Sequence, residues 1–258
     1  MTDNLGVDND WFEELSSEPF LIAGPCAAES EKQILDTGRF LAETGKVNVF
    51  RAGLWKPRTR PGTFEGARLE ALPWLKKLKQ ETGLKLITEV ARASHIDAVL
   101  EAGIDMIWIG ARTTGNPFAV DEIADRLSGV DIPVFVKNPL HPDPELWIGS
   151  IERFKDVGIR KLAAIHRGFY PYEPTELRNL TNWDIPVELM RKFPNLPMIC
   201  DPSHIAGKRE LVPEIANKAL SLGMNGLMIE VHPDPDSALS DARQQLDFEL
   251  LKNFLDLK

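Results

Sequence analysis

The sequence predicts an α/β fold, a single (β/α)₈ or TIM barrel, and two observations carry this prediction. Short apolar runs alternate with longer amphipathic stretches, and the runs number eight. The chain has 258 residues, the length typical of one such barrel. Strands that alternate with helices pair in parallel through right-handed crossovers, and eight units suit a closed barrel better than an open doubly wound sheet, the main rival.

The predicted strands are short runs rich in branched or aromatic apolar side chains. In chain order they are residues 20–23, 47–51, 84–90, 106–109, 134–137, 161–165, 197–200 and 226–231. Amphipathic stretches that predict helices lie at residues 30–44, 69–82, 93–101, 119–127, 143–157, 187–193, 209–222 and from 240 to the C-terminus. Several of these helices are followed by glycine, as at Gly45 and Gly83, because glycine adopts the left-handed conformation that ends a helix. Helix, glycine and strand are therefore the repeating unit.

The repeat begins after a polar N-terminal segment. Residues 1–19 are predicted to be an extension and residues 20–258 the catalytic barrel. Stretches rich in proline and glycine, at residues 56–66 and 138–143, directly follow strands and are short, so neither is typical of a linker. We expect one domain.

Composition excludes several classes of function. The chain has 30 Lys and Arg against 39 Asp and Glu, a net charge of −9, which argues against a broad cationic surface for nucleic acid. The first residues are acidic and polar, unlike a signal peptide, and no apolar run approaches the roughly 20 residues that span a bilayer. Two cysteines, Cys26 and Cys200, are too few for a disulfide scaffold and fit a reducing compartment. We expect a cytoplasmic protein with no nucleic-acid or membrane partner.

Chemically capable residues follow every predicted strand. In a barrel of this kind the active site is built at the carboxyl ends of the strands. In chain order these ends lead to Gly24-Pro25-Cys26, to Arg51 and then Lys56-Pro57-Arg58-Thr59, to Thr88-Glu89, to Gly110-Ala111-Arg112-Thr113, to Lys137-Asn138, to His166-Arg167-Gly168, to Asp201-Pro202-Ser203-His204, and to Glu230 with His232 and Asp241 beyond.

One subset of these residues suits a metal ion. Cys26, His204, Glu230 and Asp241 offer one thiol, one imidazole and two carboxylates. Mixed sulfur, nitrogen and oxygen donors favour one divalent ion such as Mn²⁺, Fe²⁺, Co²⁺ or Zn²⁺ over Mg²⁺ or Ca²⁺. A lone cysteine more often packs in a core, which is the interpretation for Cys200, but the common placement of the four residues at strand ends favours a metal site.

A second subset is cationic. Its members are Arg51, Lys56, Arg58, Arg112, Lys137 and Arg167. Six like charges around one mouth repel one another unless anions neutralise them, and Arg binds phosphate and carboxylate through two parallel hydrogen bonds. Two anionic ligands, or one ligand with several charges, are therefore predicted.

These residues together resemble a known family, the metal-dependent barrel enzymes that condense phosphoenolpyruvate, and among them the type I DAHP (3-deoxy-D-arabino-heptulosonate 7-phosphate) synthases. The resemblance covers residues 20–247 and is closest to the compact microbial subtype without a fused regulatory domain, similar to the subgroup often joined to chorismate mutase. The motifs that carry it are Ala23-Gly24-Pro25-Cys26, Arg51-Ala52-Gly53 with Lys56-Pro57-Arg58-Thr59, Ile109-Gly110-Ala111-Arg112, Asp201-Pro202-Ser203-His204, Glu230-Val231-His232-Pro233 and Leu239-Ser240-Asp241.

The resemblance implies an activity and a role for each site residue. The reaction is an aldol-like condensation of phosphoenolpyruvate with erythrose 4-phosphate and water, the first step of the shikimate pathway to chorismate and the aromatic amino acids. The implied metal ligands are Cys26, His204, Glu230 and Asp241. The residues implied to bind phosphoenolpyruvate are Arg51, Lys56, Arg112, Lys137 and Arg167, with Glu89 nearby. Arg58 and Thr59 are implied to bind the phosphate of erythrose 4-phosphate.

Three residues are candidates for proton transfer. We expect Lys56 to protonate the aldehyde oxygen, with a pKa lowered by surrounding cations, and His204 and Asp241 to help relay protons. The sequence departs from many relatives at His166, which precedes Arg167 where they have glutamate, and over residues 138–147 after Lys137. A homodimer or homotetramer is implied, and a separate chorismate mutase or regulatory partner is compatible with the chain.

Three alternatives stay open. Octulosonate 8-phosphate synthases, which use arabinose 5-phosphate, typically have Lys-Ala-Asn-Arg-Ser where this chain has Lys56-Pro57-Arg58-Thr59. A class I aldolase would form a Schiff base on a lysine such as Lys137. A non-catalytic barrel would act as a scaffold for another shikimate-pathway enzyme.

Overall fold

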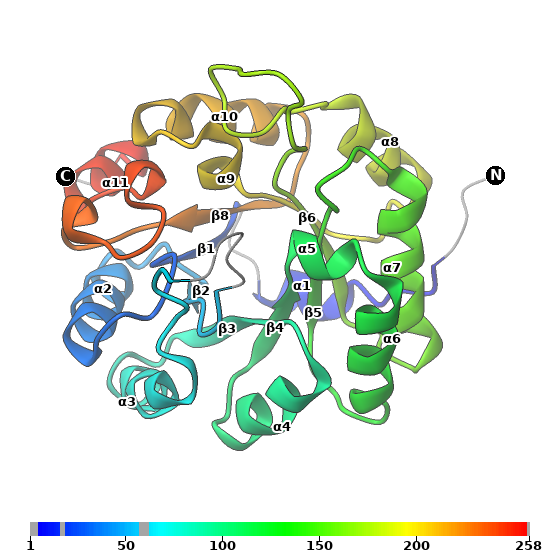
Figure 1. The fold of residues 1–258 in the computed structure, drawn as a ribbon, viewed down its shortest axis with the longest axis horizontal. Helices are drawn as coiled ribbons and strands as arrows, with labels where there is room; N and C mark the ends of the chain where they lie inside the picture. Colours follow the sequence, from blue (N-terminus) through cyan, green and yellow to red (C-terminus); the bar gives the residue numbers. More distant parts are fainter. Residues whose placement is uncertain (1–4, 16–18, 57–61, 257–258) are drawn as a thin grey trace.

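Eight parallel strands close into one barrel, which confirms the predicted fold (Figure 1). The structure is a computed structural model and describes residues 5–15, 19–56 and 62–256. The strands are β1 (Phe20–Gly24), β2 (Val49–Arg51), β3 (Lys85–Val90), β4 (Met106–Ile109), β5 (Val134–Lys137), β6 (Leu162–His166), β7 (Met198–Cys200) and β8 (Gly226–Glu230). Because β1 pairs with β8 from Phe20↔Gly226 to Gly24↔Glu230, the sheet is closed and the open alternative is excluded.

The helices lie outside the barrel, most of them between successive strands, while the first helix precedes β1 and the last follows β8 (Figure 1). They are α1 (Asp10–Leu15), α2 (Glu31–Glu43), α3 (Leu72–Thr82), α4 (Ala93–Glu101), α5 (Ala111–Thr114), α6 (Pro117–Arg126), α7 (Pro144–Asp156), α8 (Asp184–Lys192), α9 (Pro202–Ala206), α10 (Val212–Ser221) and α11 (Phe248–Phe254), with 3₁₀ turns η1 (Arg68–Ala71), η2 (Arg209–Leu211), η3 (Pro235–Ser237) and η4 (Ala242–Gln244). In the described part of the chain, no helix has the length and apolar character needed to cross a membrane.

Short polar side chains start several helices. Ser30 Oγ accepts a hydrogen bond from Gln33 N at 3.2 Å, and Asp143 Oδ1 accepts one from Leu146 N at 3.0 Å. These caps satisfy backbone donors that the first turn of a helix leaves unpaired. At the other end of a helix, Gly83 has φ 72°, the left-handed conformation expected after α3.

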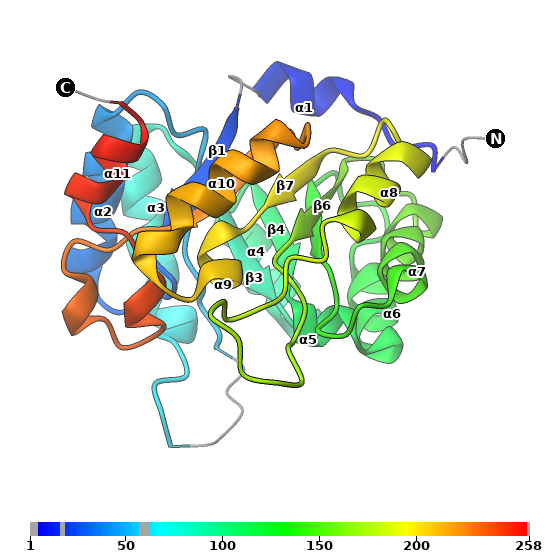
Figure 2. The ribbon, with the colours of Figure 1, turned by 90° about the horizontal axis from the view of Figure 1, so that it is seen from above.

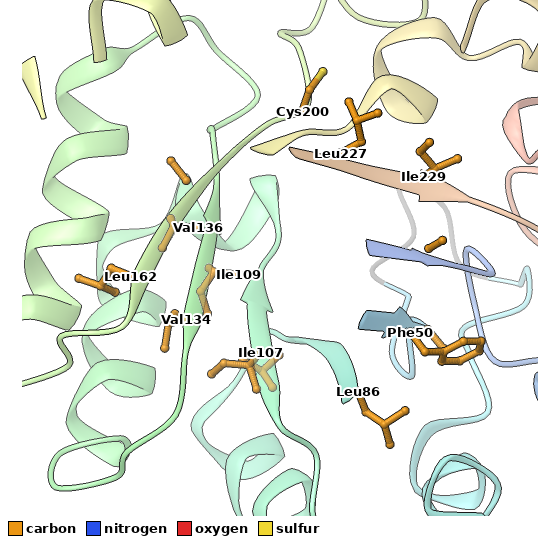
Figure 3. Packing of buried hydrophobic residues seen from close by; sticks show 14 of the residues in the cluster. Phe50, Leu86, Ile107, Ile109, Val134, Val136, Leu162, Cys200, Leu227 and Ile229 are labelled. Atoms are coloured by element: carbon orange, nitrogen blue, oxygen red, sulfur yellow. The ribbon is translucent and has the colours of Figure 1, made fainter. Parts of the chain in front are cut away.

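Two apolar layers follow from the alternation of side chains along each strand. On β5, Val134 and Val136 face the helices, whereas Phe135 faces the barrel interior. Figure 3 shows members of the outer layer such as Leu86, Ile107 and Leu162. Cys200 belongs to this outer layer and is fully buried, which confirms its predicted packing role.

The N-terminal segment is more than a polar extension. Within it, α1 places Trp11 and Phe12 against the inner layer, with ring centroids 5.8 Å from Phe135 and 4.8 Å from Phe20. Figure 2 shows α1 at the end of the barrel opposite the loop that follows β6. The two aromatic side chains therefore close the amino end of the barrel.

The predicted single helix from residue 240 to the C-terminus is wrong. Asp241 has φ 45°, in the left-handed region, and a 3₁₀ turn follows it. Leu246 then pairs with Val231 as an extension of β8, and α11 starts only after Asp247. The extended pairing breaks the helix and fixes the loop that carries Asp241.

Candidate active site

A layer of charged side chains lies directly above the apolar interior of the barrel. Successive inward-facing positions on a strand are two residues apart, so the residue two places beyond an inner apolar side chain also faces inward. Six such pairs are Val49 and Arg51, Ile87 and Glu89, Phe135 and Lys137, Ile165 and Arg167, Ile199 and Asp201, and Met228 and Glu230. The carboxyl end of the barrel is therefore polar because six of the eight strands lead into a charged residue that faces inward like the apolar side chain two places before it.

A cavity of about 670 Å³ opens above this layer. Seven predicted site residues line it: Lys56, Glu89, Arg112, Lys137, Arg167, His204 and Asp241. Leu140, His141, Tyr170, Arg178 and Asn179 also line it and were not among the predicted residues. Arg58 and Thr59 lie outside the described residues.

The four predicted metal ligands converge at one edge of the cavity. One ligand atom from each of Cys26, Glu230 and Asp241 lies within 4.8 Å of the others, and Cys26 Sγ is 3.4 Å from Asp241 Oδ2. His204 Nε2 lies 3.8 Å from Glu230 Oε1 and 3.9 Å from Asp241 Oδ2. Glu230 Oε1 is buried and makes no hydrogen bond among the described residues. This set of one sulfur, one nitrogen and two carboxylates fits a divalent ion of the transition series.

Asp201 orients the candidate ligand His204. Its Oδ2 lies 2.8 Å from His204 Nδ1, and its Oδ1 accepts a hydrogen bond from His204 N at 3.0 Å. The contact leaves Nε2 facing the two carboxylates. Burial lowers the pKa of His204, so the ring is neutral near pH 7, the form that binds metals.

The same aspartate pairs with Lys137. Lys137 Nζ donates to Asp201 Oδ2 at 2.6 Å, and both side chains are buried. Burial lowers the pKa of Lys137, and nearby Arg51 acts in the same direction. Burial alone would raise the pKa of Asp201, but His204 and Lys137 hold it well below its usual range.

Arg51 is buried beneath the cavity, between Glu230 and an aromatic ring. Its Nη2 lies 3.3 Å from Glu230 Oε1 and 3.2 Å from Cys26 O, and its guanidinium carbon is 4.8 Å from the ring centroid of Trp108. Its Nε and Nη1 atoms have no hydrogen-bond partner among the described residues. An anionic ligand would satisfy these donors.

Arg167 is held by neighbouring amides. Its Nη1 donates to Asn179 Oδ1 at 2.7 Å, and its backbone N donates to Asn138 Oδ1 at 2.7 Å. Burial lowers its pKa to about 10, which leaves the guanidinium charged near pH 7. Arg167 is therefore a fixed cation on the cavity wall.

Lys56 contradicts one expectation. Its Nζ lies 2.8 Å from Cys26 Sγ, next to the anionic cluster rather than among the cations. Burial lowers the pKa of Lys56, but Cys26, Asp241 and Glu230 outweigh burial and raise it. The predicted lowering is wrong because the loop after β2 carries this lysine to the candidate ligands.

Glu89 lies against Gly110 and Trp108. Trp108 Nε1 donates to Glu89 Oε2 at 3.0 Å. A Cβ atom at position 110 would come within 2.3 Å of Glu89 Oε1, so a larger residue here would force this carboxylate to move. The glycine of the Ile109-Gly110-Ala111-Arg112 motif thus has a packing reason at the site.

His166 lies outside the cavity. It is fully buried, with ring centroids 5.2 Å from Trp183 and 5.8 Å from Phe169. Burial lowers its pKa to about 3, so it stays neutral near pH 7. It packs on the helix side of β6, whereas Arg167 faces the cavity.

Sequence reasoning named Asp201 only within a motif and assigned no role to it, to Arg178 or to Asn179. Asp201 carried a usable signal, since it stands two positions after the inward-facing Ile199. Arg178 and Asn179 lie on the loop between β6 and α8 and carried no such signal. Arg178 Nη1 is 3.3 Å from Asp241 Oδ1, and Asn179 Nδ2 donates to His204 O at 2.6 Å.

Comparison with known proteins gives a consistent set of matches. The profile described as the DAHP synthetase I family matches residues 15–258. The chain is 34% identical over 235 residues to phospho-2-dehydro-3-deoxyheptonate aldolase of Thermotoga maritima, covering 91% of this chain and 67% of that protein. A crystal structure of that aldolase, also called DAHP synthase, superposes with a TM-score of 0.83 at 34% identity, over 92% of this chain and 67% of that one. A 2-dehydro-3-deoxyphosphooctonate aldolase of Xylella fastidiosa is more distant, at 30% identity over 88% of this chain and 85% of that protein.

Proposed function

Because the chain belongs to the DAHP synthetase I family, we propose that it is a 3-deoxy-7-phosphoheptulonate synthase. It condenses phosphoenolpyruvate with erythrose 4-phosphate and water to give 3-deoxy-D-arabino-heptulosonate 7-phosphate and phosphate, the first step of the shikimate pathway. The observation that carries the proposal is that a cluster of metal-type donor atoms lies, through Asp241, against the same cavity that Lys56, Arg112, Lys137 and Arg167 line.

We propose that Cys26, His204, Glu230 and Asp241 bind one divalent ion, of the class Mn²⁺, Fe²⁺, Co²⁺ or Zn²⁺. When bound, such an ion supplies Lewis-acid polarisation of the aldehyde oxygen. The distances between the donor atoms support this assignment, as does Glu230 Oε1, which is buried and accepts no hydrogen bond among the described residues.

The cations hold the substrate anions in a reactive arrangement. Arg51, Arg112, Lys137 and Arg167 bind the phosphate and carboxylate of phosphoenolpyruvate, with Glu89 beside them. Arg58 and Thr59 bind the phosphate of erythrose 4-phosphate. Fixing two substrates in this way contributes up to about 7–11 kcal/mol to a bimolecular step, since their translational and rotational freedom is lost on binding rather than in the reaction.

Residues beside the aldehyde of erythrose 4-phosphate carry out the proton transfers. C3 of phosphoenolpyruvate attacks the aldehyde carbon, water attacks C2, and phosphate leaves by cleavage of the C–O bond. Lys56 remains protonated because its pKa is raised, and from this position it donates a proton to the oxygen that becomes the new hydroxyl. His204 and Asp241 lie within reach of the same region and help relay protons.

The remaining parts of the proposal concern organisation. Residues 20–258 form the catalytic barrel, with residues 1–19 as an extension. The protein assembles as a homodimer or homotetramer, and a separate chorismate mutase or regulatory protein is a compatible partner.

The test is release of phosphate from phosphoenolpyruvate. The protein is assayed with erythrose 4-phosphate or arabinose 5-phosphate, each with Mn²⁺ and with EDTA. We expect release only with erythrose 4-phosphate and metal. A preference for arabinose 5-phosphate would instead indicate the activity of an octulosonate 8-phosphate synthase, the type of enzyme to which the Xylella relative belongs.

Two further outcomes would overturn the proposal. Activity that survives EDTA, with a covalent adduct trapped by borohydride, would indicate a Schiff base on Lys137. No phosphate release with either aldehyde, from folded and metal-loaded protein, would favour a scaffold.

A further inference from the structure

A buried glutamine joins the two loops that carry the candidate ligands Cys26 and Asp241. Gln245 is fully buried, and both ends of its side-chain amide are engaged. Its Oε1 accepts a hydrogen bond from Cys26 N at 2.9 Å, and its Nε2 donates to Ser240 O at 2.9 Å. Ser240 immediately precedes Asp241, so one side chain touches the backbone at one ligand and next to the other.

The backbone of Gln245 is itself anchored to the barrel. The neighbouring Leu246 pairs with Val231, with Leu246 N donating to Glu230 O at 2.8 Å and His232 N donating to Leu246 O at 2.9 Å. Gln245 therefore lies on a continuation of β8, and its side-chain amide holds both loops in place relative to the barrel.

A second contact ties the same two loops. Glu29 Oε1 accepts a hydrogen bond from Leu239 N at 2.9 Å, and Glu29 Oε2 lies 3.5 Å from His232 Nε2. The backbone of Leu239 thus bonds to the side chain of Glu29, and the backbone of Ser240 bonds to the side chain of Gln245. Together these bonds fix the two residues that precede Asp241.

Asp241 needs such support because of its backbone. Its φ of 45° lies in the left-handed region, which is unfavourable for a residue with a Cβ atom. Such a conformation persists where neighbouring contacts determine it. Its carboxylate then lies 3.4 Å from Cys26 Sγ, a separation that either loop would change by moving alone.

We propose that Gln245 is a positioning residue for the metal site: it holds the Cys26 and Asp241 loops at the separation at which both side chains bind one divalent ion. The inference rests on the proposed metal-dependent function. Residues behind metal ligands typically change metal affinity 10- to 100-fold when replaced, because the ligands lose their fixed orientation.

The experiment is titration of metal-stripped protein with Co²⁺, followed by the near-ultraviolet thiolate-to-cobalt charge-transfer band. Gln245→Met keeps the length of the side chain and removes both hydrogen bonds. We expect its Kd for Co²⁺ to rise about 10- to 100-fold, with a weaker thiolate band. Turnover is expected to recover partly at high Co²⁺ concentration, which a merely unfolded fraction would not show.

Gln33→Met is the matched control. Gln33 is also buried and bonds to the Cys26 loop at both ends, since its Nε2 donates to Ala27 O at 3.0 Å and its Oε1 accepts from Glu29 N at 3.1 Å. These bonds anchor the Cys26 loop, whose residue Glu29 also bonds to Leu239, and they leave the Gln245 bridge to the Asp241 loop intact. We expect the control to lose thermal stability while its Kd for Co²⁺ stays within about twofold of the wild type, below the range for residues behind ligands.

Three outcomes would overturn the inference. An unchanged Kd in Gln245→Met, or an equal loss of affinity in Gln33→Met, would show that Gln245 has only a structural role. If Gln245→Met does not fold, Gln245→Asn, whose shorter amide cannot span both partners, must show the same weakened binding. Absence of a thiolate band in the wild-type protein would instead overturn the proposed metal site itself, and this inference with it.

Discussion

The carboxylate of Asp201 lies 2.6 Å from the ammonium group of Lys137, and neither side chain is exposed to solvent. A buried pair of this kind costs desolvation on both sides, so its members depend on each other. The same carboxylate holds His204, which links a candidate metal ligand to a candidate phosphoenolpyruvate ligand through one residue.

Asp201→Asn removes this shared charge while keeping the shape of the side chain. We expect the free energy of unfolding to fall by about 3–5 kcal/mol, because Lys137 is left as an unpaired buried cation. We expect kcat/KM to fall about 10- to 100-fold, because His204 loses its orienting partner. Urea unfolding and steady-state kinetics measure the two effects.

The control for Asp201→Asn is Asp131→Asn. Asp131 pairs with Lys161 at 2.7 Å on the surface, where its side chain is 79% exposed. Exposed pairs contribute about 0–1 kcal/mol, so this variant should behave like the wild type. Equal destabilisation in the two variants would contradict the importance assigned to burial.

Lys56→Ala should act mainly on turnover. If Lys56 donates a proton to the aldehyde oxygen, kcat falls by about 10²–10⁴ even at saturating concentrations of both substrates. Lys56→Arg keeps the positive charge but changes the position of the proton donor. This variant should restore substrate binding more fully than it restores kcat. A Lys56→Ala variant with a raised KM and normal kcat would limit this lysine to substrate binding.

His166 should make stability depend on pH. Burial lowers its pKa in the folded protein to about 3, below the ordinary value of 6.5. Between these values the unfolded chain binds the proton and the folded chain does not, so this contribution to stability is complete above about pH 6.5 and is lost as the pH falls towards 3. At pH 5 the loss from this group is about 2 kcal/mol.

His166→Gln removes the titrating ring and tests this sign. The difference in unfolding free energy between pH 7 and pH 5, measured with urea, should be smaller in the variant than in the wild type. An identical pH dependence of stability in the two proteins would be the contrary result.

Phe12→Ala tests whether packing at the amino end of the barrel affects the site at the carboxyl end. Phe12 is buried against Phe20 at the amino end, far from the cavity. Removing a buried phenylalanine costs about 3–5 kcal/mol, so the melting temperature should fall. Below that temperature kcat and the KM values should stay at wild-type levels, and a large change in either would mean that α1 communicates with the site.

Barrel architecture and much of the site were predictable because they depend on periodicity. Parallel strands all end at one face, so Arg51, Lys137 and Glu230 had to converge there whatever the details of the loops. By the same period of two, Asp201 was within reach of sequence reasoning. The role of α1 was hidden, because the acidic residues around Trp11 and Phe12 give the segment a polar composition.

Features set by loop conformation could not be predicted. The pKa of Lys56 depends on which neighbours its loop brings close, and these proved to be Cys26, Asp241 and Glu230 instead of the arginines. Arg178, on the loop after β6, and the left-handed Asp241 are likewise products of tertiary contacts. No local pattern in the sequence encodes such long-range distances.

The pairing of β1 with β8 also orders events during biosynthesis. Cys26 and Asp241 are 215 positions apart, and Glu230 ends the strand that closes the barrel. On the ribosome, the donor cluster cannot exist until the final strand has emerged and docked against the first. The proposed metal binding would thereby be confined to chains whose synthesis has passed Asp241, because a nascent chain stopped before β8 has no assembled donor cluster.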